Sequence, residues 1–149
     1  MFTRKLLLTP FVLIAALQVA AAEWQTDYAK ALAKAKAENK RVLLDFTGSD
    51  WCGPCIQLNK TVFSTKEFRA FADKNLIFVE VDYPKAKKQS AELVQQNEKL
   101  AKEYGIDEKG YPTLVLLDPL GRKIRELTGY SGETTNDFIA WIEGTGSEE

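Results

Sequence analysis

The sequence predicts an α/β domain with a mixed central sheet and helices on both of its faces. Apolar runs without polar alternation are typical of strands that are covered on both sides, and helical patterns alternate with these runs along the chain. The last two expected strands follow each other directly across a turn signal at residues 118–121. This hairpin makes the expected sheet mixed rather than purely parallel.

The first 22 residues have the layout of a secretory signal peptide, with a basic start, an apolar run over residues 6–17 and small residues up to Ala22. A retained membrane anchor is the alternative, but it needs about 18 or more apolar residues. We expect cleavage near Ala22 and export to the periplasm. The mature domain is expected over residues 23–143, followed by a disordered tail over residues 144–149.

Composition limits the chemistry that is available. The 149 residues suffice for one domain with a substantial core. The net charge of −1 gives no electrostatic reason to expect nucleic acid as a partner. Because the chain contains no histidine, Ser–His and Cys–His catalysis and the commonest zinc ligand are excluded.

The first half of the mature chain predicts three helices and two strands. Thr26 or Asp27 can cap the first helix, and Pro54 suits the first turn of the second, where its missing N–H costs nothing. Ser64 and Glu67 have the spacing of a capping box. The expected elements are a helix over 26–39, a strand over 41–46, helices over 52–63 and 64–73, and a strand over 76–81. The expected core residues of the second helix are Ile56, Leu58, Val62 and Phe63.

The second half begins with a basic loop over residues 83–89, whose lysines are interpreted as a solvated face. Gly105 ends the polar helix that follows. The remaining expected elements are that helix over 90–104, strands over 113–117 and 123–127, and a helix over 131–142.

The two cysteines, Cys52 and Cys55, stand where the first strand gives way to a helix. A thiol at the first turn of a helix meets unpaired backbone N–H groups and the positive end of the helix dipole, and both favour the nucleophilic thiolate. Cys55 is close enough to attack a mixed disulfide formed by Cys52. A structural disulfide here would close a very short loop and stabilise little. We interpret the pair as redox-active, with an inactive structural pair and a two-thiolate copper(I) site as alternatives.

The segment Trp51-Cys52-Gly53-Pro54-Cys55 resembles the active-site signature of the thioredoxin family, and Leu44-Asp45-Phe46 resembles the strand that carries a buried aspartate in that family. The resemblance covers roughly residues 32–142 and implies the thioredoxin fold. It implies that Cys52 attacks a substrate disulfide and Cys55 resolves the mixed disulfide. The redox-active pair itself would then serve in place of any cofactor or metal.

Asp45 is expected in an apolar strand, where burial raises the pKa of a carboxyl group. The resemblance implies that it accepts the proton of Cys55, and a solvated position at the strand end is the alternative. One more residue separates Asp45 from Cys52 than in typical thioredoxins, and this residue falls within 47–50. Glu80 stands near the place of a lysine in many thioredoxins. Two neighbouring carboxylates would raise one pKa further, whereas a charged residue at a strand end is the alternative.

The resemblance also indicates substrate-binding residues. Trp51, Gly53 and Pro54 would form part of the docking surface, although an ordinary half-buried aromatic side chain also explains Trp51. X–Pro bonds in folded proteins are cis in only about 5–6% of cases, but the resemblance implies a cis bond before Pro112. It further implies that the backbone of Tyr111 pairs with an extended substrate segment. Thioredoxins usually carry a smaller aliphatic residue at the place of Tyr111, so we expect narrower substrate choice.

These features predict an exported, periplasmic thiol–disulfide oxidoreductase that acts as a monomer on disulfide-containing proteins. The Gly53-Pro54 pair resembles reducing thioredoxins more than oxidising family members, which favours a reductase over an oxidase or isomerase. A reductase in an oxidising compartment needs electrons, so a membrane or periplasmic thiol donor is implied. The competing class is a thioredoxin-fold binding module that holds a partner protein or copper(I) without redox turnover.

Overall fold

The computed structural model describes residues 24–145. The expected signal peptide and its cleavage point lie outside the described residues, as does most of the expected tail. Gly144 and Thr145 are described, and each donates its backbone N–H to the carbonyl of Ala140 at 2.9 Å. These two residues therefore cap the last helix.

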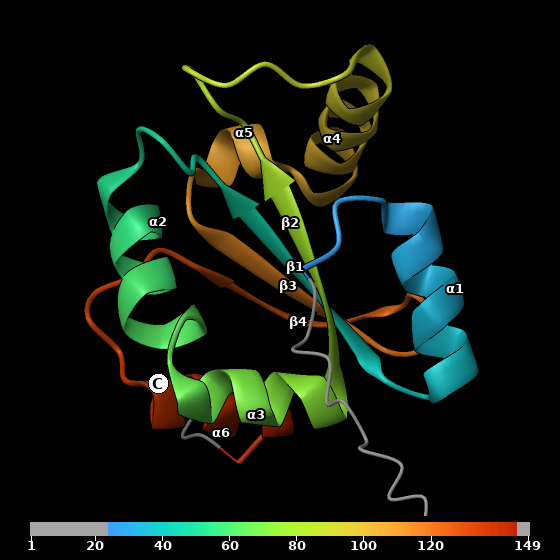
Figure 1. Ribbon diagram of the computed structural model, residues 1–149, viewed down its shortest axis with the longest axis vertical. Coiled ribbons are helices and arrows are strands. Elements are labelled where there is room, and N and C mark those ends of the chain that lie inside the picture. Colours follow the sequence, from blue (N-terminus) through green and yellow to red (C-terminus); the bar gives the residue numbers. More distant parts are fainter. Residues whose placement is uncertain (1–23, 146–149) are drawn as a thin grey trace, which may run out of the picture.

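A four-stranded sheet in the order β2-β1-β3-β4 forms the centre of the domain (Figure 1). Strand β1 is parallel to β2 and antiparallel to β3, and β3 forms a hairpin with β4. The predicted mixed sheet with its terminal hairpin is confirmed. The strands are β1 (Arg41–Thr47), β2 (Leu76–Asp82), β3 (Thr113–Leu117) and β4 (Lys123–Thr128).

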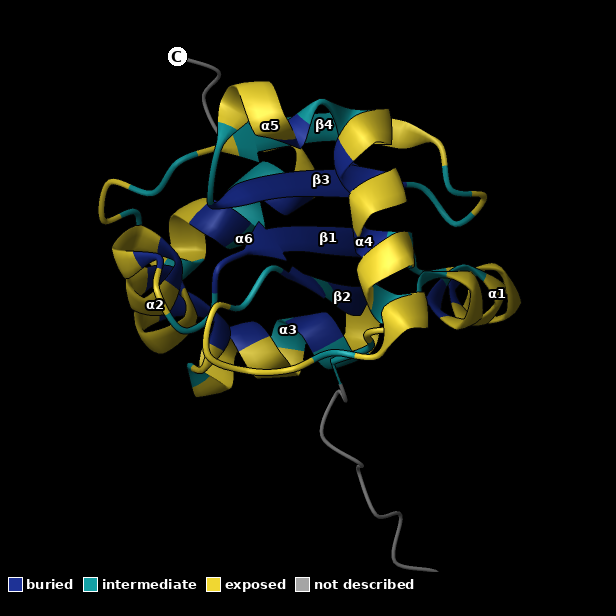
Figure 2. Cartoon of the chain, turned by 90° about the horizontal axis from the view of Figure 1, so that it is seen from above, coloured by how far each residue is buried: buried dark blue, intermediate teal, exposed yellow. Residues whose placement is uncertain are grey.

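Helices cover both faces of this sheet. One face carries α1 (Tyr28–Glu38), α4 (Ala91–Tyr104) and α5 (Ile106–Lys109). The other carries α2 (Gly53–Leu58), the π-helix η1 (Asn59–Phe63), α3 (Lys66–Asn75) and α6 (Thr135–Glu143). Figure 2 shows β1, β2 and β3 largely buried between these layers, while β4 is only partly covered and the outer sides of the helices are exposed. Within residues 24–145, no helix has the length and apolar character needed to span a bilayer.

The second face has an aromatic core centred on Phe63. Its ring centroid lies 5.6 Å from that of Trp24, 5.0 Å from those of Phe68 and Phe78, and 6.1 Å from that of Phe138. Each aromatic pair of this kind contributes about 0.5–1.5 kcal/mol beyond its buried area. Phe63 therefore fixes the helix that follows the cysteines against the sheet.

The chain before α1 runs along the outer edge of β2. The backbone N–H of Gln25 donates to the carbonyl of Phe78 at 2.8 Å, and the N–H of Glu80 donates to the carbonyl of Gln25 at 2.9 Å. The ring of Trp24 lies 3.8 Å from that of Phe78. Gln25 thus forms an isolated parallel β-bridge with Val79 at the edge of the sheet.

The expected helix over residues 52–63 is α2 followed directly by a π-helical turn. The N–H of Ser64 donates to the carbonyl of Asn59, five residues earlier, at 2.8 Å. A five-residue turn brings residues five apart toward the same side, so Leu58 and Phe63 are both buried. Ile56 is 46% exposed, so its prediction as a core residue was wrong.

Helix α3 begins after Thr65, whose hydroxyl accepts the N–H of Phe68 at 3.2 Å. The predicted capping box from Ser64 to Glu67 is wrong. Ser64 still has helical backbone angles because it closes the π turn, whereas an N-cap residue needs an extended backbone.

Two further differences concern the second half of the chain. The last helix begins at Thr135 rather than Ser131, because Thr134 and Asp137 form its capping box. The short helix α5 was not predicted.

Candidate active site

Cys52 and Cys55 form a disulfide at the start of α2. Cys52 is the N-cap residue, and its Sγ accepts the backbone N–H of Cys55 at 3.4 Å. Cys52 is only 6% exposed and Cys55 only 4%. Gly53 and Pro54, which lie between them in the first turn, are exposed. After reduction, the helix terminus would favour negative charge on the Cys52 sulfur.

A tight turn joins β1 to this disulfide. The carbonyl of Gly48 accepts the N–H of Trp51 at 3.2 Å and that of Cys52 at 2.9 Å. A Cβ atom on Gly48 would lie 2.5 Å from the ring of Trp51, so a larger residue would displace the ring.

Three aromatic side chains lie next to one another beside the turn. The Trp51 and Tyr111 rings meet edge to face at 5.7 Å, and the Tyr83 ring lies 5.3 Å from that of Tyr111. Trp51 is 39% exposed, and its Nε1–H donates to the carbonyl of Tyr83 at 2.7 Å. The Tyr111–Pro112 bond is cis, as predicted. The structure thus brings together Trp51 and Tyr111, which were predicted separately, and adds Tyr83.

Asp45 is 5% exposed, and within residues 24–145 its buried Oδ1 accepts no hydrogen bond. The alternative of a solvated position at the strand end is wrong. Burial raises the pKa of Asp45 well above its usual value, and the negative charges of Glu80 and Asp82 raise it further. Alternate strand residues share a face, so Asp45 lies with Leu43 on the face that α2 covers. No described hydrogen bond joins Asp45 to either cysteine sulfur.

Glu80 is the cross-strand partner of Asp45 in the register of β1 and β2. The expected neighbouring carboxylates are therefore confirmed. Burial and the charge of Asp82 raise the pKa of Glu80, while Lys87 acts in the opposite direction. Sequence reasoning missed Asp82, which accepts the N–H of Ser49 at 2.9 Å and the Ser49 hydroxyl at 2.5 Å. Nothing local in the sequence signals this contact, because Ser49 lies in the turn after β1 and Asp82 is the last residue of β2.

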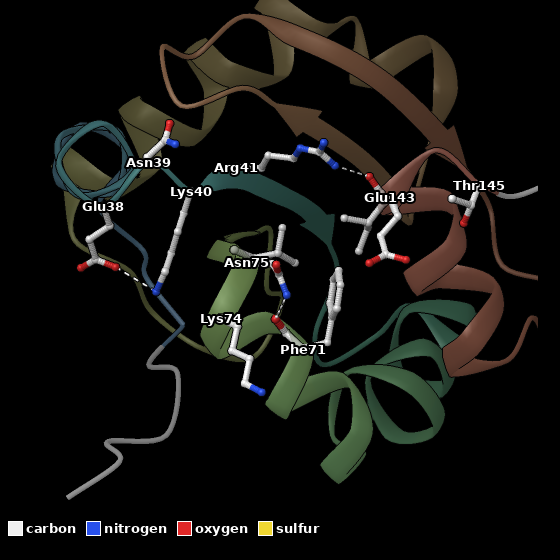
Figure 3. Close-up of a pocket in the computed structure, with 11 residues that line it drawn as sticks. Glu38, Asn39, Lys40, Arg41, Phe71, Lys74, Asn75, Glu143 and Thr145 are labelled. Carbon is white, nitrogen blue, oxygen red and sulfur yellow. Dashed lines mark hydrogen bonds and ion pairs between the residues drawn. The ribbon is translucent and has the colours of Figure 1, made fainter. Parts of the chain in front are cut away.

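A hollow of about 560 Å³ lies at the opposite end of β1, between the ends of α1, α3 and α6 (Figure 3). Lys40 pairs with Glu38 at 2.9 Å and donates to the carbonyl of Asp73 at 2.8 Å. Arg41 donates to the carbonyl of Ile142 at 2.6 Å. Both cations therefore hold helix ends in place, and the Cys52–Cys55 disulfide lies beyond the other end of the strand.

Comparison with known proteins agrees with this geometry. The chain is 38% identical over 105 residues to the disulfide bond reductase DsbH of Chlamydia pneumoniae, which covers 70% of this chain and 61% of that protein. It is 34% identical over 115 residues to the thioredoxin-related protein DsbJ of the same organism, which covers 77% of this chain and 32% of that protein. The chain thus spans less than two thirds of the length of either relative.

Solved structures extend the similarity to nearly the whole chain. A DsbH oxidoreductase superposes with a TM-score of 0.76 at 30% identity, covering 97% of this chain and 94% of that one. A thioredoxin from Thermus thermophilus, at 21% identity and a TM-score of 0.62, shares the fold over 84% of this chain and 87% of its own. Residues 23–119 match the family described as thioredoxin-like. With its mixed sheet and its disulfide at the start of α2, the chain belongs to the thioredoxin-like family.

Proposed function

We propose that this chain is an exported thiol–disulfide oxidoreductase that reduces disulfides in other proteins. The observation that carries the proposal is the Cys52–Cys55 disulfide at a helix N-terminus, where the Cys52 sulfur accepts a backbone N–H. The similarity to a protein named disulfide bond reductase supports the reductive direction.

The reaction starts from the reduced pair. The Cys52 thiolate attacks one sulfur of the substrate disulfide, the substrate S–S bond breaks, and the departing sulfur takes up a proton. Cys55 then loses its proton to the Asp45 carboxylate and attacks the Cys52 sulfur of the mixed disulfide. This step forms the Cys52–Cys55 bond and releases the second substrate thiol. In total, two electrons pass from the cysteine pair to the substrate. The two substrate sulfurs take up two protons, one balancing the proton that Cys55 gives to Asp45 and one from solvent.

The buried position of Asp45 supports its role as proton acceptor. Burial raises the pKa of Asp45 well above its usual value, which lets the carboxyl group exchange protons at a higher pH than an exposed one. Glu80 and Asp82 strengthen this effect through their charge. Asp45 lies on the face of the sheet that α2 covers, which is also the helix that carries Cys55.

The surface around the disulfide supports docking of an extended segment. Gly53 and Pro54 are exposed, so a substrate can approach the cysteines from that side. The backbone of Tyr111 would pair with the substrate as in strand addition. The Tyr111 ring, fixed by Trp51 and Tyr83, would narrow the range of accepted segments.

We propose cleavage near Ala22, a periplasmic location and action as a monomer. Each turnover leaves the cysteine pair oxidised, so a membrane or periplasmic thiol donor must return two electrons. The substrates are proteins that carry disulfides accessible to Cys52.

Trapping of mixed disulfides tests this function. Cys55→Ser keeps the nucleophile but removes the resolving thiol, so it should accumulate covalent complexes with a reducible protein such as insulin. These complexes should appear on a non-reducing gel and disperse with dithiothreitol. Cys52→Ser is the matched control and should accumulate almost none. Equal trapping by both variants would contradict the assigned roles, and trapping by neither would favour a binding module.

A further inference from the structure

The loop between β2 and α4 is fixed against the turn that carries the active-site tryptophan. The Asp50 carboxylate accepts the backbone N–H groups of Lys85 at 2.9 Å and Ala86 at 2.7 Å. The N–H of Tyr83 donates to the carbonyl of Thr47 at 2.9 Å. These bonds join residues more than thirty positions apart in the chain, so the loop has a defined place beside the site.

This placement brings lysines to the entrance of the active site. The Nζ atom of Lys85 lies 4.1 Å from the centre of the Trp51 ring, and Trp51 directly precedes Cys52. The Nζ atom of Lys87 donates to the Ser49 hydroxyl at 3.3 Å. Lys85, Lys87 and Lys88 are all exposed. We call these three residues the lysine loop.

The lysine loop keeps its positive charge available. Among the ion pairs within residues 24–145, none joins a lysine of the loop to a carboxylate. The nearby Asp50 accepts backbone N–H groups, which lower its pKa and keep it ionised, and Asp82 binds Ser49. On the side of α5, burial and then the negative charge of Asp107 raise the pKa of Tyr111.

We propose that the lysine loop is a docking surface for an acidic segment next to the disulfide of the protein substrate. This inference rests on the proposed reductase function and names a substrate class for it. A merely solvated lysine run does not require the hydrogen bonds that fix the loop against Asp50 and Trp51. A loop that is already ordered loses less conformational entropy when it binds. Complementary charge at the rim of a binding site increases the rate of association and the specificity for the partner.

Reduction of matched peptides tests the inference. The peptides share one disulfide and carry glutamates, glutamines or lysines beside it. At low ionic strength the protein should prefer the acidic over the neutral peptide in kcat/KM by about fivefold, since each exposed pair contributes little. Added salt should reduce this preference.

A triple variant with Lys85, Lys87 and Lys88 replaced by glutamine should lose the preference. The matched control replaces Lys34, Lys36 and Lys74, three exposed lysines near the starts of β1 and β2, and should keep it. An equal preference in both triple variants would overturn the inference, as would a wild-type protein that does not distinguish the peptides.

A binding measurement separates this inference from the proposed function. The oxidised protein is titrated with a cysteine-free acidic peptide, and the NMR signal of the Trp51 Nε1–H is followed. The signal should shift with the acidic peptide in the wild type and not in the lysine-loop variant. If no peptide is reduced but this shift is seen, the reductase proposal fails and the docking surface stands. If reduction proceeds and the signal does not respond, the docking surface is refuted.

Discussion

Replacing Asp45 with asparagine should stabilise the oxidised protein by an amount that grows with pH. Asp45 is 5% exposed, and burial, followed by the charges of Glu80 and Asp82, raises its pKa in the folded state. Between the unfolded and folded pKa values, the folded protein keeps a proton that the unfolded chain has lost. The stability of the wild type therefore falls as pH rises through this interval. Asparagine has the shape of the protonated acid and does not titrate.

The size of the effect follows from proton linkage. Within the interval, the advantage of Asp45→Asn should grow by about 1.4 kcal/mol for each pH unit. For a domain of this size, 1 kcal/mol corresponds to about 4 °C in Tm, so the difference in Tm should widen by about 6 °C per pH unit.

Thermal unfolding followed by circular dichroism, without reductant, measures this difference from about pH 4.5 to about pH 6.5, above the usual carboxyl pKa. Glu67→Gln, which removes an exposed carboxylate, is the control and should show no such trend. A difference between Asp45→Asn and the wild type that stays constant across this range would mean that Asp45 is ionised in the folded protein. That result would refute the argument that burial raises the pKa of Asp45.

Three other outcomes are expected. In a Glu80→Gln background, the stability advantage of Asp45→Asn should stop growing at a lower pH, because one of the charges that raise the Asp45 pKa is removed. The same pH dependence as in the wild-type background would show that Glu80 does not affect the Asp45 pKa. In urea denaturation, Leu58→Ala should lose about 2–5 kcal/mol of stability, whereas Ile56→Ala should change it by about 0.5 kcal/mol or less. Equal losses would contradict the burial of Leu58 and the exposure of Ile56. Mass spectrometry of the exported protein should find a chain that begins near Glu23 rather than at Met1.

Sequence reasoning worked where a feature depends on residues that are close together in the chain. Apolar runs predicted β1, β2 and β3, because burial on both faces leaves little place for polar alternation, and the turn signal at residues 118–121 predicted β4. The Cys52–Cys55 pair and the proline before β3 were recognised from short motifs. Each of these features can be read within a few residues, and the structure has them where they were expected.

Features that depend on distant segments or on a change of helical period were not predicted. A single 3.6-residue period placed Ile56 in the core, whereas the π turn at Asn59–Phe63 changes which residues face inward. Asp50 and Lys85 are 35 positions apart, and only the parallel pairing of β1 and β2 brings their loops together. A lysine run read alone therefore gave no indication of its place beside Trp51.

The β-bridge between Gln25 and β2 also affects whether other chains can pair with the sheet edge. An open sheet edge offers unpaired N–H and carbonyl groups to any extended peptide, and self-association follows readily from such an edge. Gln25 already occupies the groups of Phe78 and Glu80 on that side. On the opposite edge, β4 presents the exposed Lys123 next to an irregularity in the pairing of β3 with β4, features that discourage edge pairing. With both sheet edges protected, an extended segment of another protein would meet the domain at the end of the sheet where the disulfide lies.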